Sequence, residues 1–177
     1  MGRRCQPCGR PVHGAGHMIL VTVGTQFGFD RLIQWMDEWA AVHPDVDVFA
    51  QIGDGDFKPA HMRWTREISP MDFPSVISAA SAIVSHAGMG TIISANLSSK
   101  TIIIVPRRAG LGEHRNEHQL ATARRFSDLP GCRVAETQKQ LDTHLASLDS
   151  SISASMGAAA GDLSQKIFEF LEREPSA

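Results

Sequence analysis

Residues 18–24, Met-Ile-Leu-Val-Thr-Val-Gly, form a continuous apolar segment that ends at a glycine. Such a segment is typical of a strand buried on both faces, as in a parallel sheet covered by helices. The next segment, residues 30–42, spaces its apolar side chains as an amphipathic helix does, and Pro44 follows it. A buried strand followed by such a helix is the first unit of an α/β domain.

The same alternation of strand and helix continues to residue 148. Further strands are predicted at 46–52, 64–68, 82–85, 101–105 and 132–135, and further helices at 72–80, 91–97, 113–126 and 138–148. Strands that alternate with helices of this length are joined by right-handed crossovers. The sequence therefore predicts an α/β fold, a Rossmann-like open parallel sheet with helices on both faces.

The chain has 177 residues, 42% of them hydrophobic, which suits one sizeable core and predicts a single domain over residues 18–149. Residues 1–17 carry basic residues, Gly and Pro without periodicity, and we expect a disordered extension there. Residues 150–161 are rich in Ser, Ala and Gly and are predicted to be a linker. Residues 162–177 are predicted to form a helix that packs on its own domain or docks on a partner.

Cys5, Cys8, His13 and His17 offer an alternative for the extension, because Cys-x-x-Cys followed by two histidines resembles zinc-ligand spacing. The loop between the pairs is far shorter than in ordinary zinc fingers and no apolar core surrounds it. Disorder is therefore the favoured interpretation, and neither a metal nor a cofactor is expected. Three cysteines are too few for a disulfide framework and no secretory signal is present, so we expect a cytoplasmic protein.

Composition also bears on the class of partner. A formal net charge of −2 and an aromatic content of 6%, without tyrosine, argue against nucleic acid. No apolar run approaches the roughly 20 residues of a membrane-spanning helix. Contact with a membrane is expected only at its surface or through a partner.

Two glycine-bearing loops follow predicted strands and are expected at the carboxyl edge of the sheet, where ligands bind. Glycine lets the backbone approach a ligand closely, and a helix start presents unpaired N–H groups, which together suit a diphosphate. Neither loop carries Gly-x-Gly-x-x-Gly or Gly-Lys-Ser/Thr, which disfavours dinucleotide and P-loop sites. The loop residues expected to meet a ligand are Gly24, Thr25, His86, Gly88, Met89, Gly90 and Thr91.

A third polar segment, residues 106–119, follows the strand predicted at 101–105 and is expected at the same edge. We expect no core residue in so dense a polar run. Its side chains suit sugar hydroxyls and its arginines suit phosphate or carboxylate, although an exposed loop is the alternative. The candidate ligands in it are Arg107, Glu113, Arg115, Glu117, His118 and Gln119.

The sequence Ser-His-Ala-Gly-Met-Gly-Thr at 85–91, followed by Pro106 and then by Glu117-His118-Gln119, resembles the C-terminal domain of glycosyltransferase family 28. That family includes the peptidoglycan N-acetylglucosaminyltransferase MurG. Stand-alone versions are more similar: the soluble subunit of the eukaryotic transferase that makes the second GlcNAc linkage of dolichol-linked oligosaccharide, and the PssE-type subunit of bacterial exopolysaccharide synthesis. The resemblance covers roughly residues 18–148.

The resemblance implies one half of a GT-B fold, in an enzyme split over two chains. This chain would bind a UDP-sugar, and a membrane-associated partner would bind the lipid-linked sugar acceptor and recruit the chain to the inner face of the membrane. The implied reaction is inverting transfer to a polyprenyl-diphosphate-linked acceptor in exopolysaccharide or glycan assembly. The partner would supply the catalytic base, with His86 as the alternative in this chain.

Family roles can be carried over to matching residues. The glycine loops would hold the diphosphate, backbone near Ile68 would meet the uracil, and His118 with Gln119 would contact the donor sugar. Related enzymes commonly bind the ribose with a Glu or Asp where this chain has Ser94. Glu113 or Glu117 is the alternative ribose ligand.

The transferred sugar stays open between glucuronate, glucose, galactose and GlcNAc. Arg107, Arg108 or Arg115 would pair with the carboxylate of a glucuronate donor. Two other functions remain as alternatives. A non-catalytic accessory would only stabilise a membrane-associated glycosyltransferase, and a stand-alone nucleotide-sugar enzyme such as an epimerase would need a second domain, which this length hardly permits.

Overall fold

The computed structural model describes residues 18–151. The predicted extension at 1–17, with its zinc alternative, lies outside the described residues. So do the predicted helix at 162–177 and all but the first two residues of the predicted linker at 150–161.

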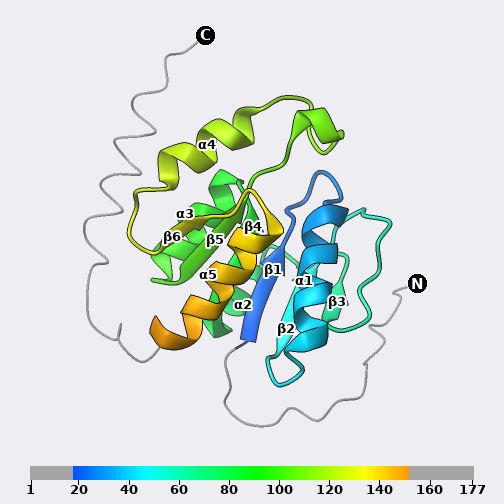
Figure 1. The fold of residues 1–177 in the computed structure, drawn as a ribbon, viewed down its shortest axis with the longest axis vertical. Coiled ribbons are helices and arrows are strands. Elements are labelled where there is room, and N and C mark those ends of the chain that lie inside the picture. Colours follow the sequence, from blue (N-terminus) through cyan, green and yellow to red (C-terminus); the bar gives the residue numbers. More distant parts are fainter. Residues whose placement is uncertain (1–17, 152–177) are drawn as a thin grey trace.

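Six parallel strands form one sheet in the order β3-β2-β1-β4-β5-β6 (Figure 1). The strands are β1 (Met18–Thr22), β2 (Val48–Gln51), β3 (Arg63–Thr65), β4 (Ala80–His86), β5 (Thr101–Val105) and β6 (Cys132–Val134). The helices are α1 (Asp30–Val42), α2 (Phe73–Ala79), α3 (Met89–Leu97), α4 (His118–Phe126) and α5 (Gln138–Ser151), with a 3-10 turn η1 (Ala109–Leu111). The predicted Rossmann-like parallel sheet is confirmed.

The central strands are apolar throughout because both faces of the sheet are covered. Successive side chains of a strand point to opposite faces. In β1, Ile19 and Val21 join the core cluster under α1 and α5, whereas Leu20 joins the cluster under α2, α3 and α4. Ile103 and Ile104 of β5 divide between the two clusters in the same way. Figure 1 shows helices on both sides of the sheet.

The strand order reverses at β1, which pairs with β2 on one side and β4 on the other. Thr22 and Ser85 are partners near the ends of β1 and β4, and His86 pairs with Val105 at the end of β5. The segments that follow these three strands therefore leave the sheet side by side. This place is the topological switch point at which open α/β sheets bind ligands.

The predicted helix at 113–126 is wrong at its start, since α4 begins at His118. The chain first makes the turn η1, which ends at Gly112 with a left-handed φ of 72°. Residues 113–117 then form an irregular segment whose side chains contact other parts of the site. At the other end of the domain, α5 continues to Ser151, past the predicted boundary at 149. Across residues 18–151, no helix has the length and apolar character needed to cross a membrane.

Candidate functional site

The first glycine loop joins β1 to α1 and turns at Gly24, which has a left-handed φ of +79°. This backbone conformation is unfavourable for a residue with a side chain. Space is also lacking, because a Cβ on Gly24 would lie 2.6 Å from Cε1 of His86. A Cβ on Gly28, at the other end of the loop, would strike the backbone of Gly55. The loop thus needs glycine at both positions.

The second glycine loop joins β4 to α3, with Gly88 as the residue before the first helical turn. A Cβ on Gly88 would strike the His86 ring, whereas a Cβ on Gly90 would meet nothing within 4 Å. Among the described residues, no side chain caps the start of α3. The first N–H groups of a helix have no partner inside the helix, so this end carries open donors and partial positive charge. Thr91 lies in the same turn and is 7% exposed.

His86 lies between the two glycine loops, since both Gly24 and Gly88 leave room for its ring. The pKa of His86 is lowered to about 4, mainly by burial and then by the positive charge of Arg107, while a hydrogen bond to the backbone of Thr22 acts in the opposite direction. The imidazole is therefore neutral at pH 7. A neutral ring with so low a pKa is a weak base, and it suits positioning better than proton abstraction.

Arg107 lies under the first loop and is only 2% exposed. Its guanidinium donates hydrogen bonds to the carbonyl oxygens of Val23, Phe27 and Gly28, at 2.7, 2.7 and 2.6 Å. It also stacks on Phe29, 4.8 Å from the ring centre. The expectation that the polar run contains no core residue is therefore wrong for Arg107. Both terminal nitrogens of Arg107 are thus occupied by backbone carbonyl oxygens.

Two buried glutamines connect the loops further. Gln51, at the end of β2, donates to the carbonyl oxygen of Gly24 at 2.8 Å. Gln119 accepts hydrogen bonds at Oε1 from the backbone N–H groups of Ala87 and Arg107, at 3.3 and 3.0 Å. Its Nε2 group has no hydrogen-bond partner among the described residues and remains available to a ligand. Gln119 was predicted as a sugar contact, while the role of Gln51 was missed.

Glu113 was predicted as an alternative ribose ligand, but both of its carboxylate oxygens accept hydrogen bonds from within the chain. Arg31, 82 residues earlier in α1, donates to Oε1 and Oε2 at 2.6 and 2.8 Å. The N–H of Arg108 donates to Oε2 at 2.8 Å. Glu117 remains as the more exposed carboxylate of this segment. Arg31 was missed, because no local pattern connects it to a partner so far along the chain.

The other predicted ligands lie at the rim of the site. The guanidinium of Arg115 lies 5.9 Å from the centre of the Phe27 ring, on the first loop. Ser94 is partly exposed on α3, and its hydroxyl has no hydrogen-bond partner among residues 18–151. Ile68 follows β3, two strands away from β1 in the sheet, and packs on the core cluster under α2. The exposed members of the predicted set are Thr25, Gly90, Arg115, Glu117 and His118.

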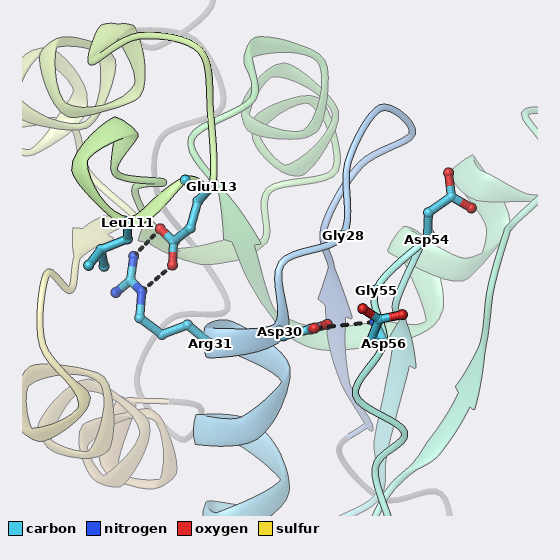
Figure 2. Close-up of a pocket in the computed structure, with 9 residues that line it drawn as sticks. Gly28, Asp30, Arg31, Asp54, Gly55, Asp56, Leu111 and Glu113 are labelled. Carbon is cyan, nitrogen blue, oxygen red and sulfur yellow. Dashed lines mark hydrogen bonds and ion pairs between the residues drawn. The ribbon is translucent and has the colours of Figure 1, made fainter.

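An open cleft of about 410 Å³ lies beside the first loop, between the start of α1, residues 54–56 and residues 111–113 (Figure 2). Four carboxylates line it, those of Asp30, Asp54, Asp56 and Glu113. The arginine of the cleft, Arg31, is already paired with Glu113. This acidic lining disfavours an anionic group, so a diphosphate fits the glycine loops better than the cleft.

Comparison with known proteins places the domain in a family. Residues 18–167 match the glycosyltransferase family 28 C-terminal domain. No curated protein sequence matches the chain.

Many solved structures share this fold, and three of them illustrate the likeness. The glycotransferase of kitacinnamycin is 24% identical, with a TM-score of 0.62, over 97% of this chain and 43% of that one. ALG13 is 15% identical, with a TM-score of 0.58, over 86% of this chain and 94% of that one. MurG from Acinetobacter baumannii is 18% identical, with a TM-score of 0.53, over 92% of this chain and 51% of that one.

The chain thus spans less than half of the kitacinnamycin enzyme and nearly all of ALG13. Its parallel sheet, with two glycine loops at the switch point, is the Rossmann-like half of a GT-B glycosyltransferase. The family match covers all of the described residues. The chain therefore belongs to the glycosyltransferase family 28 C-terminal domain family.

Proposed function

We propose that this chain is the donor-binding half of a two-chain inverting glycosyltransferase. It binds a UDP-sugar, and the assembled enzyme transfers the sugar to a polyprenyl-diphosphate-linked acceptor in exopolysaccharide or glycan assembly. The chain is active only with its partner, a membrane-associated subunit that binds the acceptor. Family membership supports the class of reaction, and the details below rest on the geometry of the site.

The observation that carries the proposal is the convergence of both glycine loops on one side chain, His86. Gly24 and Gly88 allow the two backbones to approach the ring, and the uncapped start of α3 adds open N–H donors. Such donors, with the helix dipole behind them, are a general solution for binding phosphate. The site therefore suits the diphosphate of a nucleotide-sugar better than a neutral ligand.

The same groups suit the chemistry of transfer. When the glycosidic bond to the diphosphate breaks, negative charge develops on the leaving UDP, and preorganised N–H donors stabilise it. The hydroxyl of Thr91, in the first turn of α3, is a further donor. His86 stays neutral, because burial and the charge of Arg107 hold its pKa at about 4, and its ring positions the two loops. The base that deprotonates the acceptor hydroxyl then comes from the partner chain.

The sugar lies toward the segment at 113–119. The free Nε2 of Gln119 and the exposed side chains of Glu117 and His118 offer donors and acceptors for its hydroxyls. Arg115 is exposed and can pair with the carboxylate of a glucuronate donor. Arg108 is partly exposed and already pairs with Glu136 at 3.3 Å, so it is the weaker candidate. A screen of UDP-glucuronate, UDP-glucose, UDP-galactose and UDP-GlcNAc, with the partner present, identifies the sugar. Equal binding of neutral sugars would remove the role of the arginines.

In this proposal the partner supplies the acceptor-binding half of a GT-B enzyme. The chain corresponds to 43% of the kitacinnamycin enzyme and to 51% of MurG. We propose that the acceptor site lies on a separate subunit. We propose that the chain is cytoplasmic and reaches the inner face of the membrane through that subunit, with residues 162–177 as a candidate docking segment.

Calorimetry with UDP tests the donor site directly. Thr91→Val keeps the shape of the side chain and removes its hydroxyl. Gly90→Asp places a carboxylate in the first turn of α3, at a position with open space for a side chain. Both variants should weaken binding. Thr143→Val, at an exposed position of α5, is the matched control and should bind UDP as the wild type does. Absence of UDP binding by the wild-type chain would favour the non-catalytic accessory instead.

The two-chain arrangement has a separate test. The purified chain should bind UDP yet transfer sugar poorly to a lipid-linked acceptor, and addition of the partner should restore transfer. Full turnover by the purified chain alone would refute the split enzyme.

A further inference from the structure

Arg107 carries a buried charge to which the proposed transfer reaction assigns no role. Its side chain is 2% exposed, and its guanidinium bonds to backbone carbonyl oxygens rather than to a carboxylate. A fourth carbonyl, that of Glu113, accepts from Nη1 at 3.2 Å. A charge removed from water is costly unless it is well satisfied, so burial of an arginine here calls for a structural or electrostatic reason.

We propose that Arg107 is a positioning residue for the donor diphosphate, which holds the first glycine loop from beneath and does not touch the donor. This inference rests on the proposed function, because it assigns a role within the same site. It replaces the idea that Arg107 recognises the sugar.

Peptide geometry explains how a residue beneath the loop controls its outer surface. In a trans peptide, the carbonyl of one residue and the N–H of the next point in opposite directions. Arg107 draws the carbonyls of Val23 and Phe27 toward itself at 2.7 Å each. The N–H groups of Gly24 and Gly28 consequently point away from the guanidinium; that of Gly24 donates to Oγ1 of Thr22 at 3.4 Å, and that of Gly28, with no acceptor among the described residues, is the donor left for a ligand. The left-handed φ of +79° at Gly24 belongs to the same loop conformation.

Arg107 also connects the first loop to the second. Its own N–H donates to Oε1 of Gln119, which accepts from the N–H of Ala87 in the second loop as well. Arg107 is thus bonded to both loops that face the candidate diphosphate site, directly to the first and through Gln119 to the second. Its positive charge lies close enough to disfavour protonation of His86, so it also favours a nearby anion.

Lysine cannot replace this arginine fully. The carbonyls of Val23 and Phe27 both accept from Nη2, while Gly28 and Glu113 accept from Nη1, a pattern that needs two nitrogens in a planar fork. A lysine ammonium keeps the charge but is a single point donor. Arg107→Lys therefore tests the geometry with the charge retained, and Arg107→Met removes both.

The experiment measures UDP and UDP-glucuronate binding by calorimetry for the wild-type chain, Arg107→Lys and Arg107→Met. Arg133→Lys is the matched control, because Arg133 also donates to a backbone carbonyl, that of His144, but on β6 and α5. Amide hydrogen exchange of residues 24–29 is measured without ligand, with residues 138–148 as the internal reference. Circular dichroism and thermal melting confirm that each variant is folded.

We expect Arg107→Lys to stay folded, to exchange the amides of residues 24–29 faster, and to bind UDP about tenfold more weakly, since it loses charge-assisted hydrogen bonds. The loss should be equal for UDP and UDP-glucuronate, and Arg107→Met should lose more. Arg133→Lys should match the wild type.

Wild-type UDP affinity in a folded Arg107→Lys, or unchanged exchange of the loop, would overturn the inference. A larger loss for UDP-glucuronate than for UDP would also overturn it, because that pattern indicates direct contact with the sugar. A wild-type chain that binds no UDP would instead refute the proposed function, so the two failures are distinct.

Discussion

Gly90→Ala should stabilise the free chain and weaken donor binding, two effects of opposite sign from one methyl group. Gly90 lies in the first turn of α3, is exposed, and has nothing within 4 Å of the position a Cβ would take. Glycine costs about 0.5–1 kcal/mol relative to alanine inside a helix, and less near a helix end. The free chain should therefore gain about 0.5 kcal/mol, or about 1–2 °C in Tm for a protein of this size.

The effect on binding follows from the proposed position of the diphosphate. If the phosphates lie against the N–H groups at the start of α3, the new methyl group occupies their space. Loss or lengthening of one charge-assisted hydrogen bond costs about 1.5–3 kcal/mol, which corresponds to roughly a 10- to 100-fold weaker affinity for UDP. Gly90 then differs from Gly88, whose Cβ would strike His86 and disturb the fold itself.

Thermal melting and UDP calorimetry on the same samples measure both effects. Asn96→Ala is the control, because Asn96 lies near the far end of α3 and gains helix propensity without approaching the glycine loops. It should raise Tm slightly and leave UDP binding unchanged. Wild-type UDP affinity in Gly90→Ala would refute the placement of the diphosphate at α3, and a lower Tm would refute the open space around Gly90.

The pKa of His86, about 4 in the folded chain against 6.5 when unfolded, means that the unfolded chain binds more protons between those values. The free energy of unfolding should keep the full contribution of neutral His86 above pH 6.5 and lose up to about 3 kcal/mol as the pH drops toward 4. Urea unfolding at pH 7 and at pH 5 measures this loss. The same loss of unfolding free energy in His86→Gln would contradict the assignment to His86. Glu113→Gln should cost about 1–3 kcal/mol because it breaks the partly buried pair with Arg31. Asp47→Asn, at an exposed pair, should cost less than about 0.5 kcal/mol, and equal urea midpoints would count against the role of Glu113. Gln119→Glu keeps an acceptor for the two buried N–H groups but loses Nε2, so it should weaken UDP-sugar binding more than UDP binding. Gln119→Met removes the acceptor and should lower the urea midpoint of unfolding. Equal losses of UDP and UDP-sugar affinity in Gln119→Glu would exclude the sugar contact.

Much of the fold follows from periodicity alone. The run at 18–24 is apolar without alternation because β1 lies in the centre of the sheet, between β2 and β4, with helices over both faces. The helix at 30–42 was predicted with its observed bounds, since an amphipathic pattern and Pro44 define it locally. The start of α4 was not predictable in this way. Residues 113–117 are compatible with a helix, but Glu113 bonds to Arg31 in another element.

The glycine loops could be located from the sequence for a general reason. The carboxyl ends of parallel strands lie at one edge, so the loops after β1, β4 and β5 were expected at that edge once the strand pattern was recognised. The strand order, which makes β1, β4 and β5 neighbours, came from the structure. Glycine marked the positions where the backbone makes tight contacts. The roles of polar side chains were harder to predict, because Arg107 and the exposed Arg115 belong to the same polar segment and only packing buries Arg107.

By itself, the sequence determined the parallel α/β architecture, the glycine positions and the edge of the sheet to which they belong. These features can be predicted because the hydrophobic period and the glycines of a short segment are visible in that segment alone. Only the tertiary structure decided which polar groups hold the site and which remain free for a ligand. Arg107 and Glu113 bond to residues up to 84 positions away, and Gln119 bonds through one end of its amide only. Burial and hydrogen-bond partners at such separations depend on how the elements pack, which no local pattern records.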